Sequence, residues 1–404
     1  MIEVSRDVMN VLAIKGGEIW TVTKGRIRRG TILINRNKIV EFGPEIRVPE
    51  GATVIDAEGR IITPGLIDAH THLGILPLEE GGRTADAVET TDPVTPQLRA
   101  IDGVNPLDPG FREAVEGGVT TVLIEPGSEI GFATGEVANV IAGQGFAVKT
   151  GGANFEGRIL KNPAGIKMAL GEHPKRTWAE KKKMPTTRMG IASMLREILY
   201  KTKAYIKKKE KACDPDSDLE VDLKLEAMAM VLKREIPARV HANRAEDIMT
   251  AIRLAEEFGF DLVLEHAFEG HMIASEMASR GIPAVVGPIL FSRRGVELKN
   301  LTPKAPALLS EAGVKVCLTT DHPTLPLQRL RVLAGLAMRE GMKEEDAIKS
   351  ITINPAEVIG ISDRVGSIEV GKDADLVIFE GDPLEPTTKV KSVLIDGEVL
   401  YQGK

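Results

Sequence analysis

The most constraining feature of the chain is the stretch Ile62–Gly74, which reads Ile-Thr-Pro-Gly-Leu-Ile-Asp-Ala-His-Thr-His-Leu-Gly. A Pro-Gly turn signal precedes a short apolar segment, and the segment ends in two histidines separated by one residue. Alternate side chains of a β-strand lie on the same face, so we expect His70 and His72 to point the same way from a strand end. Two neutral imidazoles in this arrangement suit one metal ion, and a purely structural role for both is the alternative.

The middle of the chain, residues 63–365, alternates apolar strands with helical stretches. This texture is typical of βα units built around a parallel sheet. We expect eight strands, at Leu66–Ala69, Thr120–Ile124, Phe146–Lys149, Gly165–Ala169, Ala238–Val240, Leu262–Leu264, Ala284–Val286 and Val314–Thr319. Eight parallel strands of this kind favour an α/β fold of the (β/α)8 TIM-barrel type, with the chemistry at the carboxyl ends of the strands. A doubly wound sheet could use the same strands.

The two ends of the chain have a different texture. Residues 1–62 and 366–404 contain short apolar runs separated by dense turn signals, which is typical of small antiparallel sheets. Neither end is long enough to close a sandwich alone, so we expect both to pair in one small β-sandwich domain. Residues 175–233 are rich in lysine and predict two or three helices inserted after the fourth barrel strand. Their charged faces are expected to be solvated, with a lid or a subunit contact as the alternative.

Metal-capable side chains also follow three other expected strands. His241 comes after the fifth strand, His266 after the sixth, and Asp321 after the eighth. A single histidine at a strand end is more often structural. The carboxyl ends of barrel strands meet at one face, however, so these side chains would converge with His70 and His72. Four histidines and one aspartate at one face indicate a metal centre.

This set of residues resembles the pattern of the metal-dependent amidohydrolase superfamily. That pattern has His-x-His on strand one, Lys or Glu on an intermediate strand, His on strands five and six, and Asp on strand eight. The chain matches it with His70, His72, His241, His266 and Asp321.

Two further motifs carry the resemblance. The run Pro-Gly-Leu-Ile-Asp-Ala-His-Thr-His is similar to the family's first metal-binding strand, and Gly366–Val377 is similar to its C-terminal signature. The resemblance spans nearly the whole chain apart from residues 175–233. It is closest to the imidazolonepropionase-like branch, with isoaspartyl dipeptidases and prolidase-type members nearby.

The resemblance implies zinc as the cofactor, as one or two ions, with another divalent metal as an alternative. It also implies that Lys167, in an apolar strand, is the carboxylated lysine that bridges two metals in binuclear members. A charged lysine facing the barrel interior without a partner would be costly, whereas a carbamate is an anionic oxygen ligand. The alternatives are a Lys167 side chain that points outward and a bridge from Glu125 or Glu172. Without a bridge, the site would hold one metal.

The ligand set predicts the mechanism. Zinc with an open coordination position lowers the pKa of its bound water to about 7, which gives hydroxide at neutral pH. We expect Asp321 to bind the metal weakly, to take the proton of the attacking water and to deliver it to the leaving nitrogen. His266 or His241 would polarise the substrate carbonyl if only one metal is bound.

Three residues are candidates for substrate binding. His173 follows the expected bridging strand, Arg244 follows the fifth strand, and Arg293, beside Arg294, follows the seventh. Arginine matches a carboxylate bidentately, although surface solvation is the alternative for at least one of Arg293 and Arg294.

We therefore predict a metal-dependent hydrolase that cleaves a C–N bond, in an amide or a cyclic amide, of a small substrate bearing a carboxylate. A dipeptidase of the isoaspartyl or prolidase type, a deaminase and a lactonase are alternatives on the same scaffold. Deaminases usually carry His-x-x-Glu after strand five, whereas Glu246 lies five positions beyond His241. A non-catalytic scaffold protein should have lost ligands, and the five clear ligand positions are intact.

The bulk composition limits the expected partners. The net charge of −6 argues against a nucleic-acid partner, which would need a basic face. The sequence contains no apolar window long enough for a membrane span, and charges within residues 1–20 argue against a signal peptide. Cys213 and Cys317 are too few for a disulfide framework, so a reducing cytoplasm is expected. The expected partner is a small-molecule substrate, and the chain could form a homo-oligomer.

Overall fold

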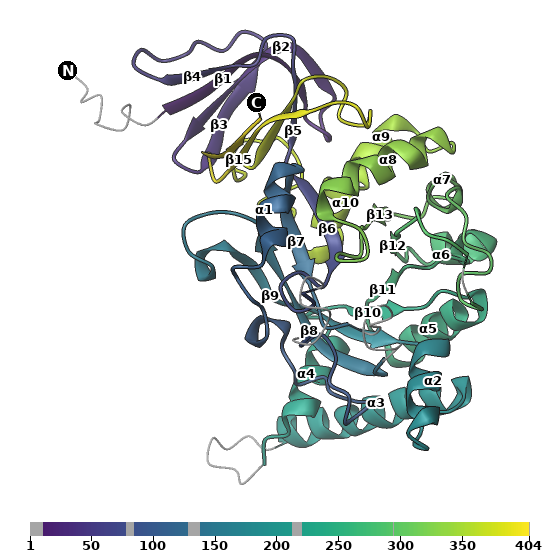
Figure 1. Ribbon diagram of the computed structural model, residues 1–404. Helices are drawn as coiled ribbons and strands as arrows, with labels where there is room; N and C mark the ends of the chain where they lie inside the picture. The colour runs from purple at the N-terminus through teal and green to yellow at the C-terminus, as the bar shows by residue number, and fades with distance from the viewer. Residues whose placement is uncertain (1–10, 78–84, 128–137, 212–219, 294, 404) are drawn as a thin grey trace.

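Two eight-stranded sheets organise the part of the chain that the computed structural model describes (Figure 1). The described residues are 11–77, 85–127, 138–211, 220–293 and 295–403, so Cys213 and Arg294 lie outside them. One sheet is a nearly closed barrel, and the other is built from strands at both ends of the chain. The predicted α/β barrel with a separate terminal β-structure is therefore confirmed.

The barrel sheet follows chain order from β6 to β13. Its strands are β6 (Leu66–Thr71), β7 (Val119–Ile124), β8 (Ile141–Lys149), β9 (Ile159–Ala169), β10 (Ala238–His241), β11 (Leu262–Glu265), β12 (Ala284–Val286) and β13 (Val316–Leu318). Each overlaps one of the strands expected from the sequence. The barrel closes where Thr319 Oγ1 donates to the His70 carbonyl over 2.7 Å and Thr71 pairs with His322.

The direction of β8 differs from the expectation of a fully parallel barrel. β8 is antiparallel to both β7 and β9, whereas β9 to β13, and β6 with β7, are parallel. Residues 150–158 connect β8 to β9, and this segment is shorter than the roughly twelve residues that a parallel crossover needs. The apolar pattern locates a strand but carries no information about its direction.

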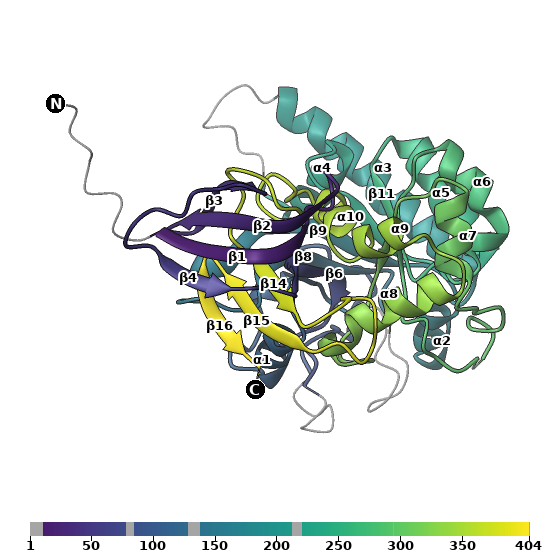
Figure 2. The ribbon, with the colours of Figure 1, turned by 90° about the horizontal axis from the view of Figure 1, so that it is seen from above.

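Helices follow most of the parallel strands and pack around the barrel (Figure 2). They are α1 (Pro109–Glu116), α2 (Glu172–Glu180), α3 (Arg188–Lys211), α4 (Leu223–Leu232), α5 (Ala245–Phe258), α6 (Ala274–Ser279), α7 (Ala305–Glu311), α8 (Leu330–Arg339), α9 (Glu344–Lys349) and α10 (Ile353–Ile359). The described residues between β9 and β10, which include the lysine-rich segment, contain α2, α3 and α4. In α5 the helically spaced Ile248, Ala251 and Ile252 are buried, and the helix ends at Gly259 with φ of 78°.

The terminal sheet joins residues that are far apart in the sequence. Its strands are β1 (Val11–Trp20), β2 (Arg26–Asn35), β3 (Lys38–Gly43), β4 (Thr53–Asp56), β5 (Ile61–Pro64), β14 (Leu376–Phe379), β15 (Val390–Ile395) and β16 (Glu398–Gln402). β14 is antiparallel to β5, which places the purple and yellow strands of Figure 1 side by side. The sheet encloses its own apolar core, which includes Ile14, Ile32, Ile62, Leu376 and Leu394.

Gly65 lies between the last N-terminal strand of the terminal sheet and the first strand of the barrel. The Pro-Gly pair does not form a hairpin, because β5 ends at Pro64 and β6 of the barrel begins at Leu66. A Cβ atom at Gly65 would lie 1.9 Å from Thr120 Oγ1, so only glycine lets the backbone approach β7 this closely. This close approach places the two histidines at the far end of β6.

A buried ion cluster also connects the barrel to the terminal sheet. Lys149, at the end of β8, is 1% exposed and lies 2.8 Å from Asp373, 3.0 Å from Asp375 and 2.8 Å from Asp396. Asp373 and Asp375 precede β14, and Asp396 follows β15. One barrel lysine therefore forms ion pairs with three acidic groups of the C-terminal segment.

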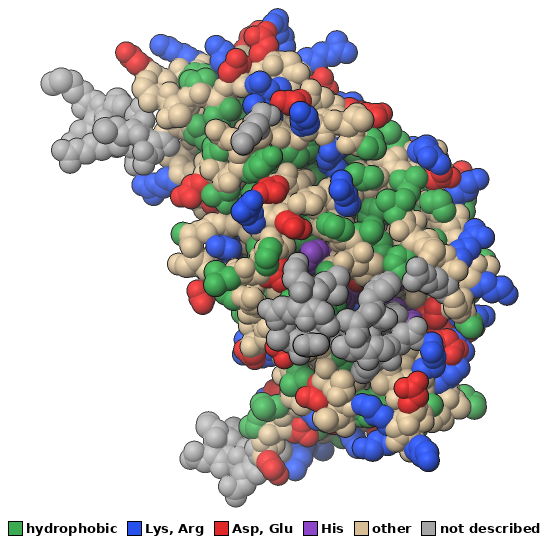
Figure 3. All heavy atoms as spheres, viewed as in Figure 1, with side chains coloured by type: hydrophobic (Ala, Val, Ile, Leu, Met, Phe, Trp, Pro, Cys, Tyr) green, Lys and Arg blue, Asp and Glu red, His purple; other side chains and the backbone are tan. Residues whose placement is uncertain are grey.

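The surface carries mixed charge. On the face in Figure 3, acidic and basic side chains are interspersed rather than gathered by sign. Among the described residues, none of the helices has the length and apolar character required to cross a membrane.

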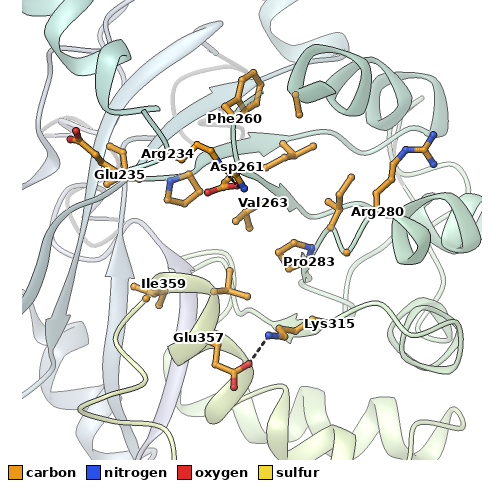
Figure 4. A pocket seen from close by; sticks show the side chains of 18 of the residues that line it. Arg234, Glu235, Phe260, Asp261, Val263, Arg280, Pro283, Lys315, Glu357 and Ile359 are labelled. Atoms are coloured by element: carbon orange, nitrogen blue, oxygen red, sulfur yellow. Dashed lines mark hydrogen bonds and ion pairs between the residues drawn. The ribbon is translucent and has the colours of Figure 1, made fainter. Parts of the chain in front are cut away.

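A cavity of about 690 Å³ lies at the end of the barrel where β10 to β13 begin (Figure 4). Pro237, Asp261 and Lys315, which precede three of these strands, contribute to its wall. Two of its basic groups form ion pairs within the wall, Arg234 with Asp261 at 2.5 Å and Lys315 with Glu357 at 2.6 Å. Barrel enzymes carry their chemistry at the opposite, carboxyl end of the strands, where the candidate residues lie.

Candidate metal centre

His70 and His72 present one ring nitrogen each to the same point. His70 Nδ1 contacts the Glu125 carboxylate, and His72 Nδ1 lies 2.8 Å from the Glu125 carbonyl. Burial and Lys167 lower the pKa of His70, but Glu265, Glu125 and Asp321 outweigh them and raise it, so the His70 Nε2–H donates to Asp321. For a metal ion to bind, that proton would leave, and Nδ1 donation to the Glu125 acceptors would then leave both Nε2 atoms as lone-pair donors, the usual arrangement of a metal-binding histidine. They face Asp321 Oδ1, at 3.1 Å from His70 and 3.6 Å from His72. The strand alternation thus predicted their common direction.

Asp321 occupies the loop after β13 with a left-handed backbone, at φ of 53°. Thr324 Oγ1 donates to its Oδ2 over 3.0 Å, and the Asp321 amide donates to Thr319 Oγ1 over 2.9 Å. Burial raises the pKa of Asp321, but the hydrogen bond from His70 and the nearby histidine charges more than offset it and lower the pKa below its usual range. The carboxylate is therefore held in its anionic form.

His266, directly after β11, lies next to His70, and His241, on the neighbouring strand β10, lies next to His266. The His266 ring lies 4.8 Å from the ring of His70 and 4.8 Å from that of His241. His266 Nδ1 lies 2.7 Å from the Gly287 carbonyl, so its Nε2 is again the nitrogen left for a ligand. Burial lowers the pKa of both His266 and His241, which keeps the imidazoles neutral, the form that binds metals.

Lys167 points into the barrel interior and is fully buried. Its Nζ contacts Glu265 and lies 3.7 Å from Glu125 Oε1. Arg239, also fully buried, lies 3.1 Å from Glu125 Oε2 and 2.9 Å from Glu265 Oε1. Lys167 and Arg239 thus form a buried ion-pair network with Glu125 and Glu265, next to His70.

The sequence interpretation missed Glu265 and Arg239. The signal was present, because each is a charged residue inside an otherwise apolar strand, where unpaired charges are rare. Arg239 is also two positions before His241 on β10, and alternate strand residues share a face. In the barrel, Arg239 pairs in register with Lys167 on β9.

A second group of possible ligands lies beyond His241. The His173 ring is 5.6 Å from the His241 ring, and His173 is the second residue of α2. Glu297, between β12 and α7, places Oε2 3.5 Å from His241 Nε2 and 3.9 Å from His173 Nε2. Burial raises the pKa of Glu297, but His241 and His173 outweigh it and hold the pKa at about 2. No pattern in the loop around Glu297 singled this residue out.

The remaining candidates lie at the edge of this group. Arg244 pairs with Glu246 at 2.6 Å and is 26% exposed. Arg293 is exposed, and its Nε donates to the Leu301 carbonyl over 3.0 Å. Glu172 pairs with Lys175 and Arg188 at the start of α2, away from the cluster formed by Lys167.

Three sets of described side chains bring ligand atoms within 4.8 Å of one another. They are His70 with His72 and Asp321, His173 with His241 and Glu297, and His70 with Glu125 and Glu265. The first set is all nitrogen and carboxylate oxygen, which suits zinc or a similar divalent ion. His70, His72 and Asp321 therefore fit a metal ion. In the third set, Lys167 and Arg239 already balance the negative charges of Glu125 and Glu265.

Comparisons with known proteins identify the family of the chain. The Amidohydrolase family model matches residues 61–400. An imidazolonepropionase of Geobacillus thermodenitrificans is 30% identical over 393 residues, which cover 87% of this chain and 84% of the relative. The amidohydrolase tasK of Hapsidospora irregularis is also 30% identical over 95% of this chain, but the match spans only 40% of that longer relative.

Solved structures share the fold. The crystal structure of an amidohydrolase from Thermotoga maritima MSB8 superposes with a TM-score of 0.91 at 44% identity, covering 97% of this chain and all of the other. A Xaa-Pro dipeptidase with bound methionine, at 18% identity and a TM-score of 0.59, shares the architecture alone over 97% of this chain and all of that one. The match of the family model over most of the chain and the agreement with the motifs lead to one conclusion: the chain belongs to the amidohydrolase family and is similar to its imidazolonepropionases.

Proposed function

We propose that the protein is a metal-dependent hydrolase that cleaves the C–N bond of an amide or a cyclic amide in a small substrate bearing a carboxylate. The observation that carries the proposal is the convergence of His70 Nε2 and His72 Nε2 on Asp321 Oδ1, at 3.1 and 3.6 Å. Two ligands of one zinc ion, each about 2.0–2.2 Å from it, lie about 3 to 3.6 Å apart. The three side chains therefore have the spacing of ligands to a common ion.

A divalent cation bound there would acidify a water molecule and act as a Lewis acid for the substrate carbonyl. Asp321 is the base of the proposed reaction, since its carboxylate is anionic and lies beside both histidines. Its carboxylate would take the proton of the attacking water and return it to the leaving nitrogen, while the hydrogen bond from Thr324 to Oδ2 fixes its orientation.

His266 has two proposed roles, as a metal ligand and as the group that polarises the carbonyl. Its Nδ1 is engaged by the Gly287 carbonyl, and burial keeps the ring neutral. Nε2 then carries a lone pair rather than a proton, which favours the ligand role for His266, with His241 beside it.

Lys167 is proposed as a ligand only in its carboxylated form. Its contacts with Glu265 and Glu125 stabilise a positive charge on Nζ, and carboxylation would place a third anion there beside Arg239 alone. A carbamate at Lys167 therefore requires a cation to enter with it. Zinc is the proposed metal, as one or two ions.

Three side chains at the edge of the site are proposed to bind the substrate. Arg244 lies next to His241 at the carboxyl end of β10, and a substrate carboxylate would have to replace Glu246 as its partner. Arg293 and His173 are proposed to contact the rest of the substrate. Imidazolonepropionases among the relatives are consistent with a cyclic amide.

The experiment compares the zinc-loaded and the metal-free protein on a substrate panel. The panel contains cyclic amides with a side-chain carboxylate, isoaspartyl and Xaa-Pro dipeptides, a lactone, and an aminopyrimidine for deamination. We expect release of a ring-opened acid from the cyclic amides, which is lost without metal and in His72→Asn. The matched control is His271→Asn, since the hydrogen bond of His271 within the described residues is to the nearby Phe268 carbonyl, away from the candidate ligands. Hydrolysis that persists in the metal-free protein would contradict the proposal.

A further inference from the structure

We propose that His173, His241 and Glu297 form a second divalent-cation site, built without Lys167. The inference rests on the proposed function only in assuming that the protein binds divalent cations. The five histidines lie in a row, His72, His70, His266, His241 and His173, with successive ring centroids 5.1, 4.8, 4.8 and 5.6 Å apart. Asp321 stands at one end of the row and Glu297 at the other, so each end has two histidines and one carboxylate.

The distances at Glu297 are those of ligands rather than hydrogen-bond partners. Glu297 Oε2 lies 3.5 Å from His241 Nε2 and 3.9 Å from His173 Nε2. A good N–H···O bond spans about 2.7–3.2 Å, so neither pair makes one. Two ligands of a tetrahedral zinc ion lie about 3.3–3.6 Å apart, and a small closing movement of His173 would complete the set.

The carboxylate is held firmly by neutral donors. The Glu172 amide at the start of α2 donates to Glu297 Oε1 over 2.5 Å, and Asn243 Nδ2 donates to Oε2 over 2.8 Å. Gly171 allows this approach, because its φ is 97° and a Cβ there would lie 2.4 Å from Glu297 Oε1. The Asn243 amide also lies 3.2 Å from His241 Nε2, so it is shared between the two ligands.

Within the part of the chain that the structure describes, the carboxylate at this end of the row pairs with histidines rather than with a permanently charged cation. Glu297 is 4% exposed, and in the described part of the chain its ion-pair partners are histidines, with no lysine or arginine among them. A buried carboxylate is costly unless a cation compensates it. Glu125 and Glu265 differ, since Lys167 and Arg239 neutralise both. Among the described residues, Glu297 thus resembles Asp321, the carboxylate at the other end of the row, whose ion-pair partners are also histidines.

The helical insertion supports this second site. Arg188 of α3 pairs with Glu172 of α2 at 2.9 Å and with Asp247 of α5 at 2.8 Å. These pairs tie α2, which carries His173, to the segment that follows His241. In this proposal, α3 of the lysine-rich insertion helps to fix the position of His173, one ligand of the second cation.

The test counts cations on the full-length protein by elemental analysis and by Co²⁺ titration calorimetry of the metal-free form. We expect two ions per chain in the wild type and one in Glu297→Gln and in His173→Asn, with the remaining ion lost when His72→Asn is added. His271→Asn is the matched control and should keep two. Thermal unfolding of the metal-free variants checks that each one folds.

Bicarbonate separates the second site from a bridge at Lys167. A carbamate bridge needs bicarbonate, so its second ion would disappear in a CO2-free preparation, whereas the ion at Glu297 should stay. Two ions retained in Glu297→Gln, or a second ion that depends on bicarbonate, would overturn the inference. The proposed hydrolysis can fail separately: two ions lost as described, without hydrolysis of any substrate, would leave the second site supported and the proposed function refuted.

Discussion

The Nε2 atom of His70 lies 3.1 Å from Oδ1 of Asp321, although the two residues are 251 positions apart in the chain. Closure of the barrel brings them together. Asp68 Oδ2, on β6, accepts hydrogen bonds from the amide and the hydroxyl of Thr320, at 2.9 and 2.7 Å, and Asp68 Oδ1 accepts from the His70 amide at 3.2 Å. Asp68 therefore connects the strand that carries the histidines to the loop that carries the aspartate.

Replacing Asp68 should weaken the first cation site without touching a ligand. Asp68→Ala leaves the buried Thr320 amide without an acceptor, which should lower the free energy of unfolding by about 1–3 kcal/mol. Loss of this supporting contact should reduce the affinity for the cation about 10–100-fold. Zinc titration calorimetry and urea unfolding measure the two effects. Asp68→Asn keeps one acceptor oxygen and should lose less, so identical results for the alanine and asparagine variants would contradict the assignment.

Asp321 should be needed for proton transfer as well as for binding. An amide cannot accept the proton of the attacking water, so Asp321→Asn should lower kcat by about 10²–10⁴-fold at matched metal content. Thr324→Val removes only the hydrogen bond to Oδ2 and should lose much less. Steady-state kinetics with elemental analysis of the same samples makes the comparison. A variant with full metal content and a kcat close to that of the wild type would refute the role of Asp321.

The sequence predicted the elements that depend on local pattern. The eight apolar runs located the barrel strands, and the alternation of β6 predicted the common direction of His70 and His72. Strand direction at β8 could not be predicted, because it depends on the length of the connection rather than on the strand. Glu297 was missed for a related reason: its place beside His241 results from the path of a loop, which has no periodicity.

The ion cluster at Lys149 should contribute to the attachment of the terminal sheet. Lys149→Met leaves three carboxylates together without their buried cation, and breaking a buried pair in this way costs about 3–5 kcal/mol. Lys38 also pairs with Asp373, but it is 40% exposed, so Lys38→Met should cost about 1 kcal/mol or less. Chemical denaturation of both variants distinguishes the two. Equal decreases in the free energy of unfolding for the two variants would contradict a larger contribution from the buried Lys149.

Asp375 should make stability depend on pH. Burial raises its pKa to about 6, although Lys149 opposes the rise and Asp396 adds to it. Because the folded pKa lies above the ordinary value of 3.8, the stabilising contribution is present at low pH and is lost as the pH rises through about 6. The contribution is on the order of 3 kcal/mol.

Asp375→Asn removes this titration. The unfolding free energies of the variant and the wild type, compared at about pH 4 and about pH 7, should shift in favour of the variant at the higher pH. Asp373, whose pKa is lowered by Lys149 despite burial, contributes the opposite trend in both proteins and cancels in the comparison. A difference between variant and wild type that does not change with pH would contradict the assignment.

The most direct test of the account is the metal content of the wild type and of His72→Asn, after loading with Zn²⁺ and extensive dialysis. His72 contributes its Nε2 to the group with His70 and Asp321, and its Nδ1 is fixed by the Glu125 carbonyl. The account predicts that the wild type retains one more zinc ion per chain than the variant, while both have the same fold by circular dichroism. Equal zinc content in the two proteins would contradict a metal centre at His70, His72 and Asp321.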